Sequence, residues 1–181
     1  GIAAEAKDLG VRVALENVFM PYFYFQQLDE FRDIRKRAPG IGVALDIGHA
    51  YISKRAAKDP DPEGSILDDV RRMGMEHLFH IHLHNNDGTR DDHDFIDGSI
   101  DMARVLAGLN DLGYTGKIVI ETLDAERMGF EPVIEKLDRI LAILAIKVRQ
   151  HVAHQAAHRL LVAGIGHPLE RADADVAMAQ P

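Results

Sequence analysis

The sequence contains no cysteine and no tryptophan, and aromatic residues make up only 6% of its 181 residues. Without cysteine, disulfides and thiolate metal sites are excluded, so any metal ion must be held by nitrogen and oxygen ligands. Long apolar runs are missing too: no segment approaches the roughly 20 consecutive apolar residues of a membrane span, and no signal-peptide pattern opens the chain. We therefore expect a cytoplasmic protein with no membrane partner.

Positive charge is also scarce. Lys and Arg number 21 against 29 Asp and Glu, which gives a formal net charge of -8. This balance argues against a surface built to bind nucleic acid phosphates. The hydrophobic share of 46% is enough for one domain with a real core.

Short strand-like runs alternate with helical stretches along the chain. Strands are expected at residues 11–16, 41–46, 78–84 and 118–121, and helices at 26–37, 66–73, 102–112 and from about Glu131. Such alternation predicts parallel βα units whose strands are buried on both faces. Four units are visible.

A complete (β/α)8 barrel needs eight such units in about 250 residues. We therefore expect an α/β fold of the TIM-barrel type, with only its C-terminal half in residues 1–145. A small open sheet, or two copies that complete each other, are the alternatives. The helical pattern directly after Gly1, where a methionine would stand, favours the half barrel.

Residues 146–181 show no strand pattern, and we expect a helical extension with a flexible tail. His154 and His158 are four residues apart and could share a helix face, but no acidic residue lies near them in sequence. A solvated or oligomer-facing helix is favoured over a metal site there, which leaves a homo-oligomer open.

Four histidines and three aspartates crowd residues 80–93. Side chains alternate along a strand, so His80, His82 and His84 share one face and Phe79, Ile81 and Leu83 take the other. A polar stripe on a buried strand needs partners, and a divalent metal suits imidazoles and carboxylates together.

The other three strands end in acids that are in phase with the inner face, Glu16, Asp46 and Glu121. In a barrel these ends meet at one mouth, together with His82. Three carboxylates at short range would repel one another without a cation. One divalent ion, Mn, Mg, Co or Zn, resolves the conflict, and the oxygen-rich set favours the harder ions. His49, just beyond Asp46, could contact a substrate oxygen or a second metal.

Five motifs stand in this order along the chain: Ala14-Leu-Glu16-Asn17, Ala44-Leu-Asp46-Ile-Gly-His49-Ala50, His80-Ile-His82-Leu-His-Asn-Asn86-Asp87-Gly88, Asp91-Asp-His93 and Ile118-Val-Ile-Glu121-Thr122. Together they resemble the xylose isomerase-like barrel superfamily, which includes sugar and sugar-phosphate isomerases, epimerases and abasic-site nucleases of the endonuclease IV type. The resemblance covers residues 1 to about 145 and the last four strands of that barrel.

In the isomerase branch the resemblance implies that Glu16, Asp46, His82 and Glu121 bind the ion, and that Glu16 and Glu121 also act as the acid/base pair. It implies substrate contacts from four residues: Asn17, His49, Asp91 and His93. The implied activity is a metal-dependent isomerase or epimerase of a sugar or sugar phosphate, working by proton transfer through an enediolate.

Two alternatives remain. In the nuclease branch the resemblance implies that His49, Asp91 and His93 join a multinuclear zinc cluster. The net negative charge and the lack of a basic loop near the site argue against this alternative. The other is a non-catalytic fragment that binds metal or dimerises, which would show splayed ligands or an exposed inner face. The chain departs from the family in a shorter turn after His93 and in Asn85 and Asn86, where many members have an acidic residue.

Overall fold

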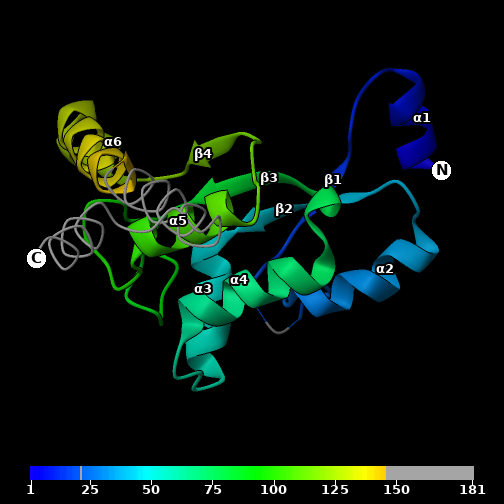
Figure 1. Ribbon diagram of the computed structural model, residues 1–181, viewed down its shortest axis with the longest axis horizontal. Coiled ribbons are helices and arrows are strands. Elements are labelled where there is room, and N and C mark those ends of the chain that lie inside the picture. The colour runs from blue at the N-terminus through cyan, green and yellow to red at the C-terminus, as the bar shows by residue number, and fades with distance from the viewer. Residues whose placement is uncertain (21, 146–181) are drawn as a thin grey trace, which may run out of the picture. The chain divides into compact units, whose positions relative to one another are not determined.

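The structure is a computed structural model that describes residues 1–20 and 22–145 (Figure 1). Nearly all of these residues belong to one compact unit, Gly1–Leu141, and the description below concerns that unit. The expected tail at 146–181, with His154 and His158, lies outside the described residues. The domain boundary at residue 145 therefore stays a prediction.

Four parallel strands lie side by side in chain order: β1 (Ala14–Glu16), β2 (Gly42–Asp46), β3 (Leu78–Leu83) and β4 (Ile118–Ile120). The structure thus confirms the predicted α/β fold with a parallel sheet. Val43, Leu45, Ile81 and Leu83 are buried, as expected of the sheet face that the helices cover.

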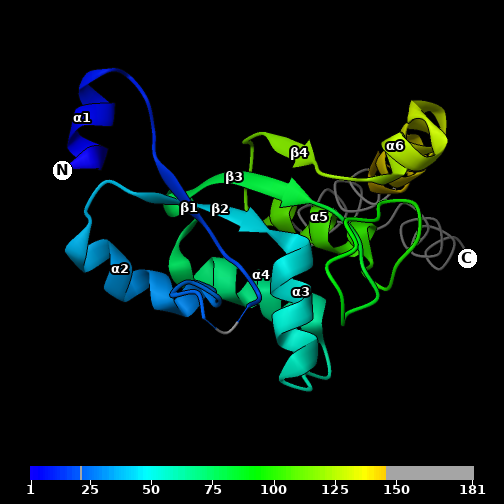
Figure 2. The ribbon, with the colours of Figure 1, turned by 180° about the vertical axis from the view of Figure 1, so that it is seen from behind.

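The helices are α1 (Ile2–Asp8), α2 (Phe31–Arg37), α3 (Ile47–Ala56), α4 (Pro62–Met73), α5 (Met102–Asp111), α6 (Asp124–Met128) and a helix over 130–145, with 3-10 turns η1 (Leu28–Glu30) and η2 (Met75–His77). Figures 1 and 2 show α2, α3, α4 and α5 on the same side of the sheet. Their buried side chains include Phe31, Ile66, Val70, Val105 and Leu109. The other face of the sheet carries the ionisable side chains.

Two helices were not expected from the sequence, α3 and α6. Helix α3 begins directly after β2, because the Asp46 side chain caps it by accepting a hydrogen bond from the His49 N–H at 2.7 Å. All residues from Ile47 to Ser53 are buried, so this helix lacks the one-sided apolar pattern by which helices are recognised in a sequence.

The expectation that Phe79 faces the helices is wrong, because β3 carries a bulge. Val43 pairs with Leu78 and Ala44 with His80, so Phe79 has no partner in the ladder. Its ring lies over Gly42, where a Cβ atom would come within 2.4 Å of it. The Arg12 guanidinium carbon lies 4.5 Å from the centre of the same ring. Phe79 therefore covers the start of the inner face.

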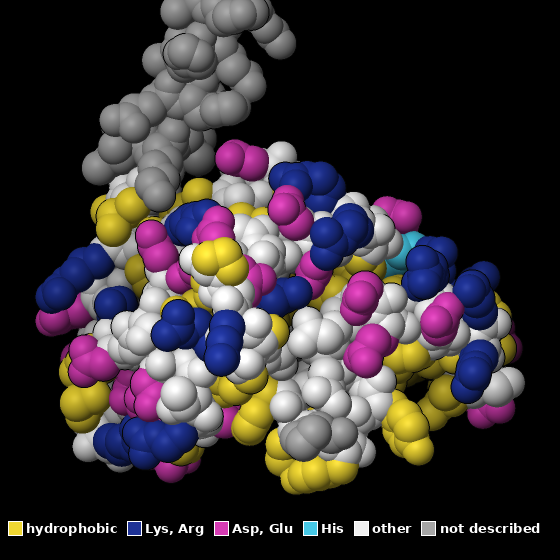
Figure 3. All heavy atoms as spheres, turned by 90° about the horizontal axis from the view of Figure 1, so that it is seen from below, with side chains coloured by type: hydrophobic (Ala, Val, Ile, Leu, Met, Phe, Trp, Pro, Cys, Tyr) yellow, Lys and Arg dark blue, Asp and Glu magenta, His cyan; other side chains and the backbone are white. Residues whose placement is uncertain are grey.

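The helical side of the sheet carries both signs of charge in close alternation, as Figure 3 shows. Many of these groups are paired: Arg104 binds Asp61 through two contacts of 2.6 and 2.7 Å, and Lys54 binds Asp69 at 2.6 Å. None of the helices in the described ranges has the length and apolar character that crossing a membrane requires.

Candidate metal centre

The strand ends bring four predicted ligands together. Glu16, Asp46, His82 and Glu121 each offer an atom within 4.8 Å of the others, and we call this group the strand-end cluster. Asp46 and His82 are direct neighbours in the register of β2 and β3. His82 Nδ1 lies 3.5 Å from Glu16 Oε2 and 3.1 Å from Glu121 Oε1. A single ion could contact all four side chains.

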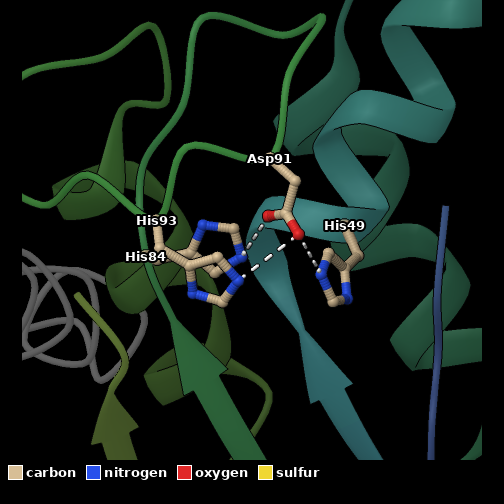
Figure 4. Close-up of side chains that lie close together, drawn as sticks. All are labelled: His49, His84, Asp91 and His93. Carbon is tan, nitrogen blue, oxygen red and sulfur yellow. Dashed lines mark hydrogen bonds and ion pairs between the residues drawn. The ribbon is translucent and has the colours of Figure 1, made fainter. Parts of the chain in front are cut away.

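A second group, the loop cluster, consists of His49, His84, Asp91 and His93. Figure 4 shows Asp91 between His49 on one side and His84 and His93 on the other. Asp91 Oδ2 lies 3.2 Å from His49 Nε2 and 3.3 Å from His93 Nε2. The members come from α3, from the residue after β3 and from the loop before α5, so only the folded chain unites them.

Asp46 stands between the two clusters. Its Oδ1 accepts hydrogen bonds from the His49 N–H at 2.7 Å and from His84 Nε2 at 3.0 Å. Its backbone is fixed by Asn17, whose amide donates to the Asp46 carbonyl at 3.0 Å and accepts from the Asp46 N–H at 2.8 Å. These contacts leave only one oxygen of Asp46, Oδ2, unengaged.

The structure places the Asn17 side chain against the Asp46 backbone, and its implied substrate contact stays a prediction. Asn17 is only 1% exposed, and both polar atoms of its side chain are bound to the Asp46 backbone. A buried amide satisfied in this way has little to offer a ligand. Asn17 therefore positions Asp46.

Burial and hydrogen bonding act in opposite directions on the Asp46–His84 pair. Burial raises the pKa of Asp46, but the hydrogen bond and charge of His84 and the charge of His49 outweigh it and hold that pKa below its ordinary value. Burial lowers the pKa of His84, but its bond to Asp46 has the larger combined effect and raises it. The pair therefore favours its charged forms.

Three buried atoms at the two clusters have no hydrogen-bond partner among the described residues: Asp46 Oδ2, His82 Nδ1 and Asp91 Oδ1. Buried polar atoms are normally satisfied, and an unpaired one costs free energy. A cation would satisfy them. Three carboxylates and one imidazole suit a hard divalent ion, whereas three imidazoles and one carboxylate suit zinc or cobalt. The residues present fit a divalent ion at each cluster.

The sequence placed His84 only on the same strand face as His80 and His82, and the structure shows it fully buried and among the side chains of the loop cluster. Sequence spacing could not reveal this, because the cluster depends on the chain returning at Asp91 and His93. His80 lies on the inner face as expected, and its ring meets that of His82 edge to face at 5.0 Å. Burial and the nearby His82 lower the pKa of His80.

The loop that follows β3 is held by amide side chains. Asn85 Oδ1 accepts from the Ile100 N–H at 2.9 Å, and the Asn85 backbone bridges to Asp94. Asn86 Nδ2 donates to the Gly48 carbonyl at 3.1 Å. A carboxylate could not donate this last bond, so the contact requires an amide at Asn86.

The family model described as xylose isomerase-like TIM barrel matches residues 1–143. The uncharacterized protein MJ1311 of Methanocaldococcus jannaschii is 32% identical over 124 residues, which cover 64% of this chain and 38% of that protein.

Two solved structures are similar. A D-tagatose 3-epimerase-like protein aligns with a TM-score of 0.64 and 26% identity, over 81% of this chain and 53% of that one. A xylose isomerase domain protein from Alicyclobacillus acidocaldarius subsp. acidocaldarius gives 0.57 and 25%, over 80% and 55%. The chain spans about half the length of these structures, which agrees with the predicted partial barrel. It belongs to the xylose isomerase-like TIM-barrel family.

Proposed function

We propose that this chain carries the catalytic metal site of a divalent-metal-dependent isomerase or epimerase that acts on a sugar or sugar phosphate. One observation carries the proposal: the strand-end cluster joins three carboxylates to an imidazole, and Asp46 Oδ2 and His82 Nδ1 are buried there without a hydrogen-bond partner among the described residues. The likeness to a D-tagatose 3-epimerase-like protein supports the substrate class.

A bound divalent ion would polarise the carbonyl oxygen and the neighbouring hydroxyl oxygen of the sugar, and it would acidify the C–H bond of the hydroxyl-bearing carbon next to the carbonyl. Glu16 and Glu121 flank His82, and their side chains are 36% and 34% exposed. They are therefore open to a substrate. One of them, as the carboxylate, can remove the proton, while the other, as the carboxylic acid, delivers its own proton to the enediolate.

His49 is well placed to orient the substrate. Its Nδ1 lies 2.9 Å from the Asn17 carbonyl, which fixes the ring and directs Nε2 toward Asp91. We infer that His49 holds a substrate oxygen, with Asp91 and His93 beside it. Donors fixed in advance cost little reorganisation in the transition state.

Hydrogen exchange tests the proposed function. The chain is incubated in D₂O with Mn²⁺ and a panel of ketoses and ketose phosphates, and loss of the C–H signal next to the carbonyl is followed by NMR. Glu16→Gln and Glu121→Gln should each slow the exchange about 100-fold or more. Glu76→Gln, an exposed acid in η2, serves as the control and should exchange at the wild-type rate. A wild-type chain that binds Mn²⁺ but exchanges no proton would refute the proposed function.

The loop cluster favours a second candidate, a zinc-dependent abasic-site endonuclease. His49, Asp91 and His93 lie within one ligand sphere, as the nuclease branch requires. The net charge of -8 argues against it. Cleavage of an abasic duplex with Zn²⁺, abolished by His93→Ala and accompanied by no sugar exchange, would promote this candidate over the first.

The non-catalytic alternative predicts splayed ligands and an exposed inner face, and the structure agrees with the second prediction only in part. Its splayed ligands are not found, because the four strand-end side chains converge. Its exposed inner face is found in part, since Val119, the register neighbour of His82, is 41% exposed. Of the two features, the convergence of like charges would destabilise the fold more if no cation bound there. The convergence therefore favours the enzyme over the non-catalytic fragment.

A further inference from the structure

A hollow of about 230 Å³ lies on the helical side of the sheet, the side that Figure 3 shows, and we call it the α2–α4 hollow. Its lining comes from η1, α2 and α4: Leu28, Asp29, Phe31, Arg32, Arg35, Asp69, Arg72 and Met73. None of these residues belongs to the strand-end cluster or the loop cluster, so the hollow is separate from the candidate metal centre. Sites for drug-sized ligands measure roughly 300–1,000 Å³, so a ligand here must be small.

Three of the lining residues carry guanidinium groups, and they come from two helices. Arg32 and Arg35 are three residues apart on α2 and therefore share a face of that helix. Arg72 lies in the last turn of α4. Guanidinium groups donate paired N–H bonds that match the oxygens of a phosphate or a carboxylate. An anion in the hollow would thus meet donors from both helices.

Arg35 has no carboxylate partner among the described residues. Its Nη1 contacts Nε2 of His77, and that nitrogen must be unprotonated to accept the bond. The His77 side chain is 19% exposed and its ring lies 5.7 Å from that of Phe31, so a neutral, largely buried group backs the guanidinium. A guanidinium has five N–H donors, and within the described part of the chain only this one of Arg35 is engaged. Arg35 therefore keeps its charge and most of its donors for a ligand.

Two carboxylates also line the hollow, and their surroundings differ. Asp69 is 6% exposed and is already paired with Lys54 at 2.6 Å and with Arg72. Asp29 is exposed, and no cation pairs with it in the described ranges. Three guanidinium groups outnumber the two carboxylates, although the whole chain has a net charge of -8. The hollow is therefore a local site of positive charge that would attract an anion.

We propose that the α2–α4 hollow binds a small ligand through a phosphate group. A phosphate carries close to two negative charges and three acceptor oxygens, so it can bind guanidinium groups of both helices at once. A carboxylate has one charge and is matched by a single guanidinium. The buried side chains of Leu28 and Phe31 also line the hollow, and the lower dielectric beside them strengthens charge-assisted bonds. The proposal goes beyond the proposed function and does not depend on it.

Isothermal titration calorimetry of the whole chain, freed of metal by EDTA and dialysis, tests the proposal. Inorganic phosphate and phenyl phosphate are the probes, and the tighter one tells whether free phosphate or a phosphate monoester is the source of the group. We expect saturable binding of at least one probe with a dissociation constant of about 1 mM or lower. Acetate should bind at least about 10-fold more weakly. Binding of neither probe, or acetate binding as tight as that of phosphate, would overturn the proposal.

Substitutions locate the bound phosphate. Arg32→Gln and Arg35→Gln should each weaken binding of the tighter probe about 10-fold, because each removes a charged donor. Arg71→Gln is the matched control, since Arg71 precedes Arg72 on α4 but pairs with Asp68 and does not line the hollow. It should bind the probe as tightly as the wild type. An equal loss in all three variants would mean that the anion follows general positive charge, which would overturn the proposal.

Asp29→Asn should change the affinity in the opposite direction. It removes the exposed carboxylate that repels an anion in the hollow, so the tighter probe should bind about threefold more tightly. Unchanged or weaker binding would overturn the assignment of the phosphate to this hollow. All four substituted residues are exposed, so each variant should fold, and circular dichroism with urea unfolding verifies this.

Discussion

Two small residues of α3 meet opposite surroundings, although both lie on its buried stretch. Gly48 faces the His84 ring with no space for a methyl group. Ser53 has space for its hydroxyl, but the oxygen is buried and has no hydrogen-bond partner within the described part of the chain. Helix propensity favours alanine at both places, so packing and polarity decide the outcome.

Gly48→Ala should destabilise the protein. Alanine in place of glycine would ordinarily gain about 1 kcal/mol in a helix, but forcing apart the His84 ring and α3 should cost about 1–3 kcal/mol. The free energy of urea unfolding measures the sum. A stabilised variant would contradict this expectation, because it would show that His84 can leave its place at little cost.

Ser53→Ala should have the opposite sign and raise the free energy of unfolding by up to about 1 kcal/mol. The change removes a buried hydroxyl whose desolvation is not compensated and improves helix propensity. The same urea series measures it. A loss of stability would mean that the hydroxyl has a partner, such as a bound water molecule.

The loop between β3 and α5 is fastened to a different element, α6. Asp124 Oδ2 accepts from the backbone N–H groups of Phe95 and Ile96 at 2.7 and 2.9 Å. Burial raises the pKa of Asp124, but these two hydrogen bonds and further contacts outweigh it, so its pKa lies below the ordinary value. The charged carboxylate is therefore the stabilising form.

Asp124→Asn should lower the free energy of unfolding at pH 7 by about 1–2 kcal/mol, because neutral acceptors bind more weakly than charged ones. The wild-type advantage should be complete above the ordinary aspartate pKa of about 3.9 and should disappear as the pH falls through the lowered folded-state pKa. Urea unfolding of both proteins from pH 7 to pH 3 checks this. Asp68→Asn on the exposed face of α4 is the control, and a pH-independent difference for Asp124→Asn would contradict the expectation.

The elements that the sequence predicted well are those whose pattern is local. Four strands were recognisable from short apolar runs, and the inward phase of Glu16, Asp46 and Glu121 followed from their parity. The bulge at Phe79 breaks that parity in one strand, and it depends on what its neighbour β2 can accommodate. Its position is a property of the pair of strands, which one strand's sequence does not reveal.

The place of His84 in the loop cluster escaped prediction for a related reason, although the family resemblance had already grouped His49, Asp91 and His93. His84 and Asp91 lie on opposite arms of a loop, and only the folding of that loop sets their Nε2–Oδ1 separation of 3.6 Å. Helix α3 was hidden because it is buried along its first seven residues. Composition and periodicity describe single segments, so they cannot predict a site that forms only through tertiary contacts.

At the scale of the molecule, repulsion among the three strand-end carboxylates lowers the stability of the fold. A bound cation would reduce this repulsion. A chain of net charge -8 adds to the repulsion that three converging acids already suffer. Ion binding to the folded state alone would therefore raise stability.

Mn²⁺ at 100 times its dissociation constant should stabilise the fold by about 2.7 kcal/mol, or roughly 5–10 °C in the unfolding temperature of a chain of this size. Differential scanning fluorimetry measures the shift, and a chelator should reverse it. Glu121→Gln should lose most of the shift and Glu76→Gln should keep it. Equal shifts in both variants would mean that Mn²⁺ acts elsewhere.

The fastening of the loop has a consequence for how this protein could change its specificity. Asn85, Asn86 and Asp124 hold the loop at its ends, whereas Thr89 and Arg90 lie exposed at its tip. Insertions at an exposed tip disturb few buried contacts. The stretch around Thr89 and Arg90 can therefore vary in length and charge while Asp91 and His93 keep their places, which makes it a natural point for laboratory evolution of new substrates.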